Sequence, residues 1–157
     1  MDDYFLRLDG IPGESQDAKH KDEIQVASFS WGVTQLGGDG RGGGGGAGRS
    51  QFQDFRFVTR VNKASPQLFL ACAGGRHIKE AHFTVRRGGK TQLEYLKITF
   101  RDVLVTSFEE SAGADAPEET VGLQFGQIEI EYTPQQATGA AAAACKAGWD
   151  LARNAPI

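Results

Sequence analysis

Apolar and polar residues alternate through most of the chain, which is the period of β-strands that bury one face. The pattern predicts six strands, near residues 3–9, 24–35, 51–61, 81–85, 96–105 and 121–132. In three of them, the second, fifth and sixth, the apolar face changes partway along. A change of face indicates a β-bulge or a strand that bends between sheets, as in barrels and orthogonal sandwiches. A strand buried on both faces gives the same pattern, so both interpretations stay open at this point.

One helix is predicted from Ser65 to Gly74. Ser65 is a good N-cap, Pro66 fits the first helical position, and Gly74-Gly75 provides a stop. The helix is too short to be stable alone and must pack against the sheet. Cys72 lies on its apolar face, where we expect a small buried hydrophobe.

Composition excludes several classes of function. The chain has 157 residues, enough for one domain with a core, and a net charge of −3. This charge gives no electrostatic reason to expect nucleic acid or a membrane surface as a partner. No apolar run is long enough for membrane insertion, and the acidic N-terminus lacks the features of a signal peptide. Cys72 and Cys145 stand far apart, which suits two free thiols in a reducing cytosol and indicates neither zinc nor a disulfide.

A glycine-rich, low-complexity segment occupies residues 37–48 and joins two candidate antiparallel strands. Its backbone amides invite comparison with phosphate-binding loops. The segment lacks the Gly-Lys-Ser/Thr ending of a P-loop, however, and a strand pattern follows it instead of a helix. We therefore expect a flexible or interface loop and not a nucleotide site.

Charged and ionisable residues show no catalytic or metal-binding spacing. His20, His77 and His82 have no partners at ligand spacing, so we expect surface or helix-end histidines. The mixed charges of residues 14–23 predict a solvated loop with weak ion pairs. No nucleophile motif is present, which argues against an enzyme, although residues far apart in sequence can converge in space.

Two serines share a strand face in the second predicted strand. Ser28 and Ser30 point one way, while Ala27, Phe29 and Trp31 point the other. One face is therefore expected in the core, and the serine face toward water or a partner. Trp31 and Trp149 are expected to be core or interface anchors.

Short sequence motifs along nearly the whole chain carry a resemblance to a known family. They are Gly-Glu-Ser-Gln-Asp at 13–17, Phe-Ser-Trp-Gly at 29–32, Lys-Ala-Ser-Pro-Gln-Leu at 63–68, His-Ile-Lys-Glu-Ala at 77–81, Glu-Tyr-Leu-Lys-Ile-Thr at 94–99, Asp-Val-Leu-Val at 102–105, residues 125–132, and Gly-Trp-Asp-Leu at 148–151. In this order they resemble the haemolysin-coregulated protein (Hcp) family of type VI secretion. The segment 37–48 lies where that family carries an extended loop that contains glycines.

The resemblance implies a mainly β fold, a small two-sheet β-barrel with one flanking α-helix and an extended glycine-rich loop. The barrel domain would span residues 1–134, and residues 135–157 would form a C-terminal tail reached through an alanine-rich linker. The tail's alanine run, residues 140–144, is an unusual feature. The implied function is structural and non-enzymatic, with no cofactor, catalytic residue or metal.

The resemblance also implies partners. Six copies would form a ring, and rings would stack into the tube of the secretion system, with a spike protein at its tip and sheath and baseplate components around it. Effectors would travel in the lumen. The chain would be cytoplasmic before assembly and then exported without a cleavable signal peptide. The alternative is a monomeric Hcp-like module that binds effectors and forms no tube.

Two groups of residues are candidates for these roles. Ser28 and Ser30 would line the lumen and contact effectors, with plain solvent-facing positions as the alternative. The ring or ring-stacking interface would use Gly37, Gly38, Asp39, Gly40, Arg41, Gly42, Gly43, Gly44, Gly45, Gly46, Ala47, Gly48, Arg49, Gln51 and Phe52. Ring closure would join one surface of a subunit to a different surface of its neighbour.

Overall fold

The computed structural model describes residues 1–37 and 49–157. Its elements in chain order are β1 (Asp3–Leu8), β2 (Ile24–Val26), β3 (Ser28–Ser30), β4 (Val33–Gln35), β5 (Ser50–Phe52), β6 (Phe55–Arg60), α1 (Ser65–Gly74), β7 (His77–Arg86), β8 (Glu94–Ser111), β9 (Glu118–Gln124), β10 (Gln127–Tyr132), β11 (Cys145–Asp150) and β12 (Ala155–Pro156). The predicted mainly β class with one helix is confirmed for the described part of the chain.

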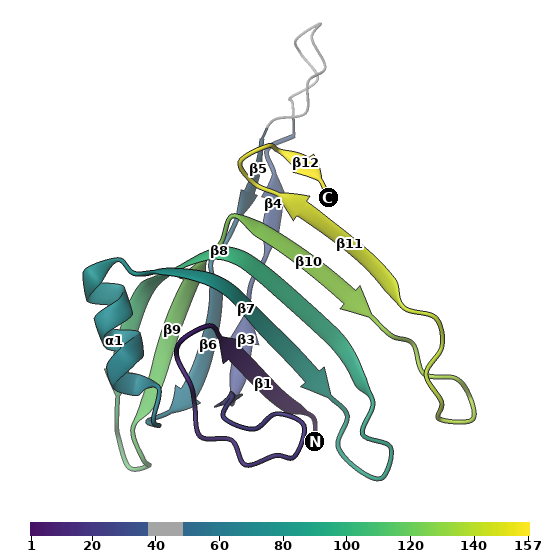
Figure 1. The fold of residues 1–157 in the computed structure, drawn as a ribbon, viewed down its shortest axis with the longest axis horizontal. Helices are drawn as coiled ribbons and strands as arrows, with labels where there is room; N and C mark the ends of the chain where they lie inside the picture. The colour runs from purple at the N-terminus through teal and green to yellow at the C-terminus, as the bar shows by residue number, and fades with distance from the viewer. Residues whose placement is uncertain (38–48) are drawn as a thin grey trace, which may run out of the picture.

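The strands form two antiparallel sheets in the described residues. The larger sheet has the order β12-β11-β10-β8-β7-β1-β2, while β9 joins β8 to β6 and β6 joins β3. Between β2 and β3 stands only Ala27, whose N–H donates to the carbonyl of Val58 on β6 at 2.7 Å. Ala27 therefore links the β1–β2 end of the large sheet covalently to its β3–β6 end. Figure 1 shows the strongly curved sheet that results, with the small β4–β5 sheet at one end.

The predicted changes of apolar face correspond to local breaks in strand geometry. In β8 the buried positions change from Phe100 to Val103, and between them Asp102 adopts a left-handed φ of 55°. The Gly126 N–H bridges the carbonyls of Arg101 and Asp102 at 2.9 and 3.1 Å. The predicted strand 121–132 is divided at this same point, into β9 and β10. The predicted strand 24–35 is likewise divided, into β2, β3 and β4.

Phenylalanines fill the space enclosed by the curved sheet. Phe55 is completely buried, and its ring centre lies 5.0 Å from that of Phe83 and 4.9 Å from that of Phe100. Phe100 continues the cluster to Phe125 at 4.8 Å. Burying side chains of this size contributes about 1.5–3 kcal/mol each relative to exposure. The aromatic cluster is therefore a main source of fold stability.

The helix α1 has the predicted bounds, but the expected N-cap is wrong. Ala64 occupies the capping position, with no side-chain cap, and Ser65 is already helical. The Ser65 hydroxyl is used elsewhere: it donates to Glu119 Oε1 at 2.6 Å and accepts from the Asn62 N–H at 2.9 Å. Gly75 ends the helix in a left-handed conformation with φ of 64°. Leu68 and Ala71 bury the inner face of α1, and Cys72 is half-buried against the core.

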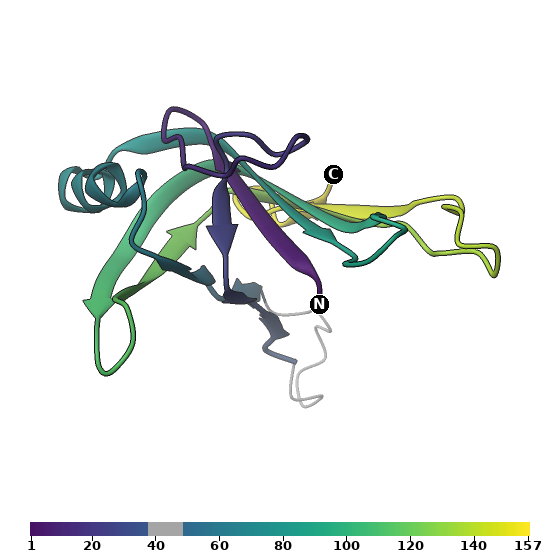
Figure 2. The same ribbon diagram turned by 90° about the horizontal axis from the view of Figure 1, so that it is seen from below.

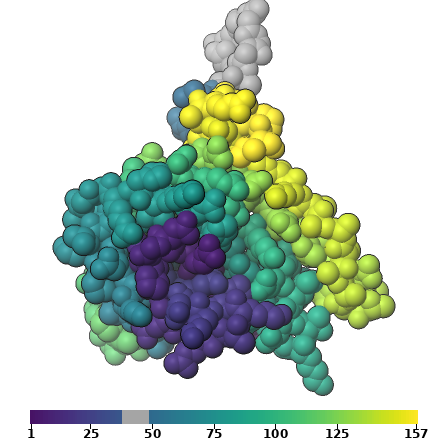
Figure 3. Space-filling view, viewed as in Figure 1, coloured from purple at the N-terminus to yellow at the C-terminus, as the bar shows by residue number. Residues whose placement is uncertain are grey.

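The C-terminal strands extend the large sheet. Along its whole length β11 pairs with β10, and β12 pairs with the end of β11. Asp150 fixes the turn between them, because its carboxylate accepts from the Arg153 N–H at 3.0 Å and from the Gln127 amide at 2.9 Å. These hydrogen bonds, the Arg153 N–H first, lower the pKa of Asp150. In the space-filling view the C-terminal residues, in yellow, form one flank of the molecule (Figure 3).

Candidate assembly surfaces and a charged cluster

An apolar groove lies between the β4–β5 hairpin and strands β10 and β11. It has a volume of about 460 Å³. Its lining residues are Trp31, Val33, Thr34, Gln35, Ser50, Phe52, Ile128, Ile130, Ala147, Gly148 and Trp149. Val33 is 48% exposed, and the Trp149 indole N–H is buried without a hydrogen-bond partner in the described residues. An apolar hollow with an unpaired donor is typical of a surface that another chain covers.

The serine face lies on the outside of the curved sheet. Ser28 and Ser30 are exposed on β3, while Phe29 between them points inward and lies 4.6 Å from Phe83, centre to centre. Ser30 stands opposite Arg56 of β6, which is also exposed. The predicted alternation is confirmed for Phe29 between the two serines, whereas Ala27, also expected on the core face, is exposed.

Of the described residues predicted at the ring or ring-stacking interface, only Phe52 lines the groove. Gly37, Arg49 and Gln51 are exposed, and Phe52 is half-buried with its ring edge-on to Phe125, 6.0 Å away. The other residues of that prediction lie outside the described residues: Gly38, Asp39, Gly40, Arg41, Gly42, Gly43, Gly44, Gly45, Gly46, Ala47 and Gly48. The groove and the predicted interface thus share Phe52.

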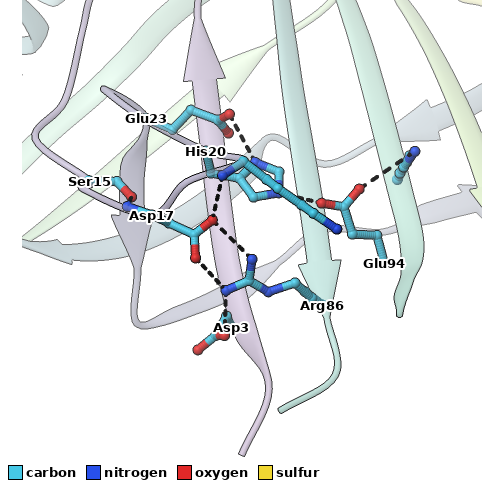
Figure 4. A network of polar contacts seen from close by, with 9 residues as sticks. Asp3, Ser15, Asp17, His20, Glu23, Arg86 and Glu94 are labelled. Atoms are coloured by element: carbon cyan, nitrogen blue, oxygen red, sulfur yellow. Dashed lines mark hydrogen bonds and ion pairs between the residues drawn. The ribbon is translucent and has the colours of Figure 1, made fainter. Parts of the chain in front are cut away.

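The loop between β1 and β2 is fixed to the sheet by charged side chains, which Figure 4 shows. Arg86 of β7 binds Asp17 with both arms of its guanidinium, at 3.0 and 2.7 Å, and reaches Asp3 at 3.1 Å. Its guanidinium carbon also lies 4.9 Å from the centre of the Phe5 ring. The hydrogen bonds from Arg86 lower the pKa of Asp17 to about 2, and the contact with Asp17 raises the pKa of Arg86 despite burial.

His20 forms the second half of this cluster. Its ring stacks on Phe5 at 4.3 Å. Nδ1 lies 2.9 Å from Glu23 Oε2, and Nε2 lies 2.5 Å from Glu94 Oε1 on β8. The two ring nitrogens therefore face a carboxyl group of the loop and one of the sheet, and His20 connects the loop to the sheet.

Two predictions about this loop are wrong. His20, expected at the surface, is only 6% exposed, and Asp17, expected in a weak, solvated pair, binds a buried arginine, whereas Glu14, Lys19, Lys21 and Asp22 are exposed as predicted. Arg86, the partner of Asp17, has a side chain that is only 5% exposed, so this pair is shielded from water. No local signal in the sequence shows these contacts, because the partners stand 69 and 74 residues away.

The other two histidines follow the surface prediction more closely. His77 pairs with Asp102 at 3.2 Å in an exposed contact, and His82 lies 2.9 Å from Glu80. The hydrogen bond with His82 lowers the pKa of Glu80. Across the 1–37 and 49–157 ranges, no three histidine, cysteine or acidic side chains are grouped to hold a metal ion. In the same ranges no helix has the length and apolar character needed to cross a membrane.

Comparison with known families supplies the context for these surfaces. A family model described as "Type VI secretion system effector, Hcp" matches residues 5–132. The chain belongs to the Hcp family. Hcp proteins are secreted structural proteins of type VI secretion and not enzymes, so the sequence-based expectations of family and of a non-enzymatic role are confirmed.

Individual Hcp proteins are similar over almost the entire chain. Protein hcp1 of Pseudomonas aeruginosa is 42% identical over 156 residues, which covers 97% of this chain and 96% of that protein. The crystal structure of Hcp1 from Salmonella typhimurium superposes with a TM-score of 0.82 at 36% identity and covers 99% of both chains. A type VI secretion effector from Yersinia pestis gives a TM-score of 0.78 at 34% identity, with 94% and 99% covered.

Proposed function

We propose that this Hcp protein is the tube subunit of a type VI secretion system. Homohexameric rings of the chain would stack into a conduit that carries or chaperones effectors for export. The observation that carries the proposal is the similarity to hcp1 over 97% of the chain, because it includes both sheets and the C-terminal strands. The surfaces described above supply the physical support.

The groove between the β4–β5 hairpin and β11 is our candidate for the contact between neighbouring subunits. Ring closure needs a heterologous interface, in which this groove meets a different surface of the next copy. Half-buried Trp31 and Trp149 are suitable anchors, since large aromatic side chains dominate the energy of protein interfaces. Burying exposed Val33 would add apolar contact area.

The residues beside the groove are our candidates for contact between stacked rings. Gly37, Arg49, Gln51 and Phe52, together with residues 38–48, would reach an adjoining ring or subunit. Holding a glycine-rich backbone in one conformation at an interface costs conformational entropy. Each contact would therefore be weak, and the six-fold repeat would reinforce it through multivalency.

The serine face is our candidate for the lumen wall. Ser28 and Ser30 are exposed, small and polar. Such side chains would leave room for cargo in the lumen and would bind no single effector tightly. Partners outside the rings would be a spike protein at the tube tip and the sheath and baseplate components. The chain would be cytoplasmic until assembly and would then leave the cell through the secretion system without a cleavable signal peptide.

Electron microscopy of the purified protein tests the proposal. Particles should be rings with six-fold symmetry, and Val33→Asp should abolish them because it places a charge in the groove. Leu70→Asp is the matched control, since Leu70 is also an exposed apolar side chain, at 59%, but lies outside the groove. Single subunits at all concentrations would favour the monomeric effector-binding module instead.

A further inference from the structure

A second cavity, separate from the groove, lies beside the start of α1. Its volume is about 480 Å³, and it is bounded by α1, β8, β9 and the segment before α1. Phe69 of α1 and Val61 form an apolar rim, and they are 58% and 50% exposed. The Phe69 ring meets Phe108 of β8 edge-on at 6.2 Å. Figure 2 shows α1 at the end of the molecule, next to the curved strand β8.

Two carboxyl groups stand together in this apolar cavity. Glu119 of β9 is completely buried and pairs in register with Glu110 of β8, which is exposed. The Ser65 hydroxyl donates to Glu119 Oε1 at 2.6 Å. The second oxygen, Oε2, is buried and receives no hydrogen bond from any described group.

The unpaired oxygen of Glu119 lowers the stability of the fold, because a buried acceptor gives up its hydrogen bonds to water and here receives none from the protein. Burial raises the pKa of Glu119, and Glu110 acts in the same direction. Glu119 therefore has a buried acceptor for which the cavity itself supplies no donor. Neither glutamate forms an ion pair with a lysine, arginine or histidine in the described ranges.

The chemistry of the cavity selects one kind of occupant. A metal ion such as Ca²⁺ needs six or more oxygen ligands, which two carboxyl groups do not supply. An anion would be repelled, and a purely apolar group would leave the Glu119 oxygen unpaired. A basic side chain fits both parts, because its methylene stem covers Phe69 and Phe108 while its cationic head reaches the carboxyl groups.

We propose that this cavity binds a lysine or arginine side chain presented by a partner protein. The cation donates hydrogen bonds to Glu119 Oε2 and Glu110. This site is distinct from the groove, since none of its residues lines the groove.

Saturation-transfer NMR on the full chain tests the site in whatever assembly the protein adopts. The probe is Nα-acetyl-lysine methylamide, and its neutral match is the same compound with an acetylated side-chain amine. We expect transfer to the methylenes of the charged probe, and binding of the neutral match weaker by tenfold or more, on the order of one charge-assisted hydrogen bond. Equal binding of the two probes, or no binding of either, overturns the proposal.

Variants of the two carboxyl groups locate the binding. Glu119→Gln and Glu110→Gln should each weaken the charged probe by roughly tenfold. Glu109→Gln is the matched control, because Glu109 is an exposed neighbour on β8 outside the cavity, and it should bind like the native protein. If Glu119→Gln fails to fold, the exposed Glu110 still decides the test. Unchanged affinity in Glu110→Gln contradicts the site.

Discussion

Arg86 of β7 holds Asp17 of the β1–β2 loop with two parallel hydrogen bonds, at 3.0 and 2.7 Å. Paired bonds of this kind between guanidinium and carboxylate are stronger and more specific than single ones. Phe5 lies under the same guanidinium and, at 4.3 Å, against the His20 ring. The Phe5 ring therefore packs against both side chains, Arg86 and His20, that fasten the loop to the sheet.

Removal of the Asp17 charge should destabilise the fold in a pH-dependent way. Asp17→Asn leaves a nearly buried Arg86 without its main partner, so we expect a loss of about 1–3 kcal/mol at pH 7. The pKa of Asp17 is lowered from 3.8 to about 2, so its contribution is complete above 3.8 and disappears as the pH falls through 2. Urea unfolding at fixed protein concentration from pH 2 to 7 measures this difference. An equal loss in the exposed-loop control Asp115→Asn would contradict it.

Loss of the imidazole should open the loop without melting the sheet. His20→Phe keeps an aromatic ring beside Phe5 but gives Glu23 and Glu94 no donor. The backbone amides of Gly13 and Ser15, which bond within the loop, should then exchange with solvent faster. Hydrogen exchange measured by mass spectrometry checks this, with peptides from β10 as the internal control. Unchanged protection of the loop would show that Arg86 alone holds it.

The buried carboxyl of Glu119 should make stability fall as pH rises. Its pKa is raised, so the folded protein holds a proton that the unfolded chain releases above pH 4.5, and stability is lost up to the raised pKa. Glu119→Gln removes this titration. The free energy of unfolding of the variant should therefore rise relative to that of the native protein as pH increases. Urea unfolding of both proteins between pH 4 and 9 provides the comparison. A difference between them that stays constant with pH would refute the explanation.

A larger side chain on the serine face should affect cargo and not rings. Ser30→Gln projects from an exposed position, so the fold and the ring should be retained while less effector stays bound. Quantitative mass spectrometry of rings purified from the native cells, compared with Ser111→Gln, measures the retained protein. If Ser30→Gln prevents ring formation, the face belongs to an interface and the lumen assignment is wrong.

Strands and helix were predictable from sequence because their signals are local. Alternation located most strands, and the change of face before Val103 anticipated the distortion at Asp102. Proline and glycine placed α1 correctly, yet its first turn is held by Glu119 from a distant strand and not by a local cap. Propensity cannot reveal a partner that the chain brings in from 54 residues away.

Candidate functional residues were predictable to a smaller extent. The outward direction of Ser28 and Ser30 follows from strand periodicity alone. The groove and the charged cluster do not, because Trp31 and Trp149 come to line one groove, and His20 reaches Glu94, only after the sheet has curved. Patterns in one segment describe its own faces, whereas these sites depend on which segments become neighbours.

Light scattering of the reduced, purified protein over a series of concentrations tests the tube proposal most directly. We expect a mass of about six times 16.9 kDa that persists on dilution, as a closed ring requires. A mass of one subunit at every concentration would contradict self-assembly of the chain and leave only its fold and family in place.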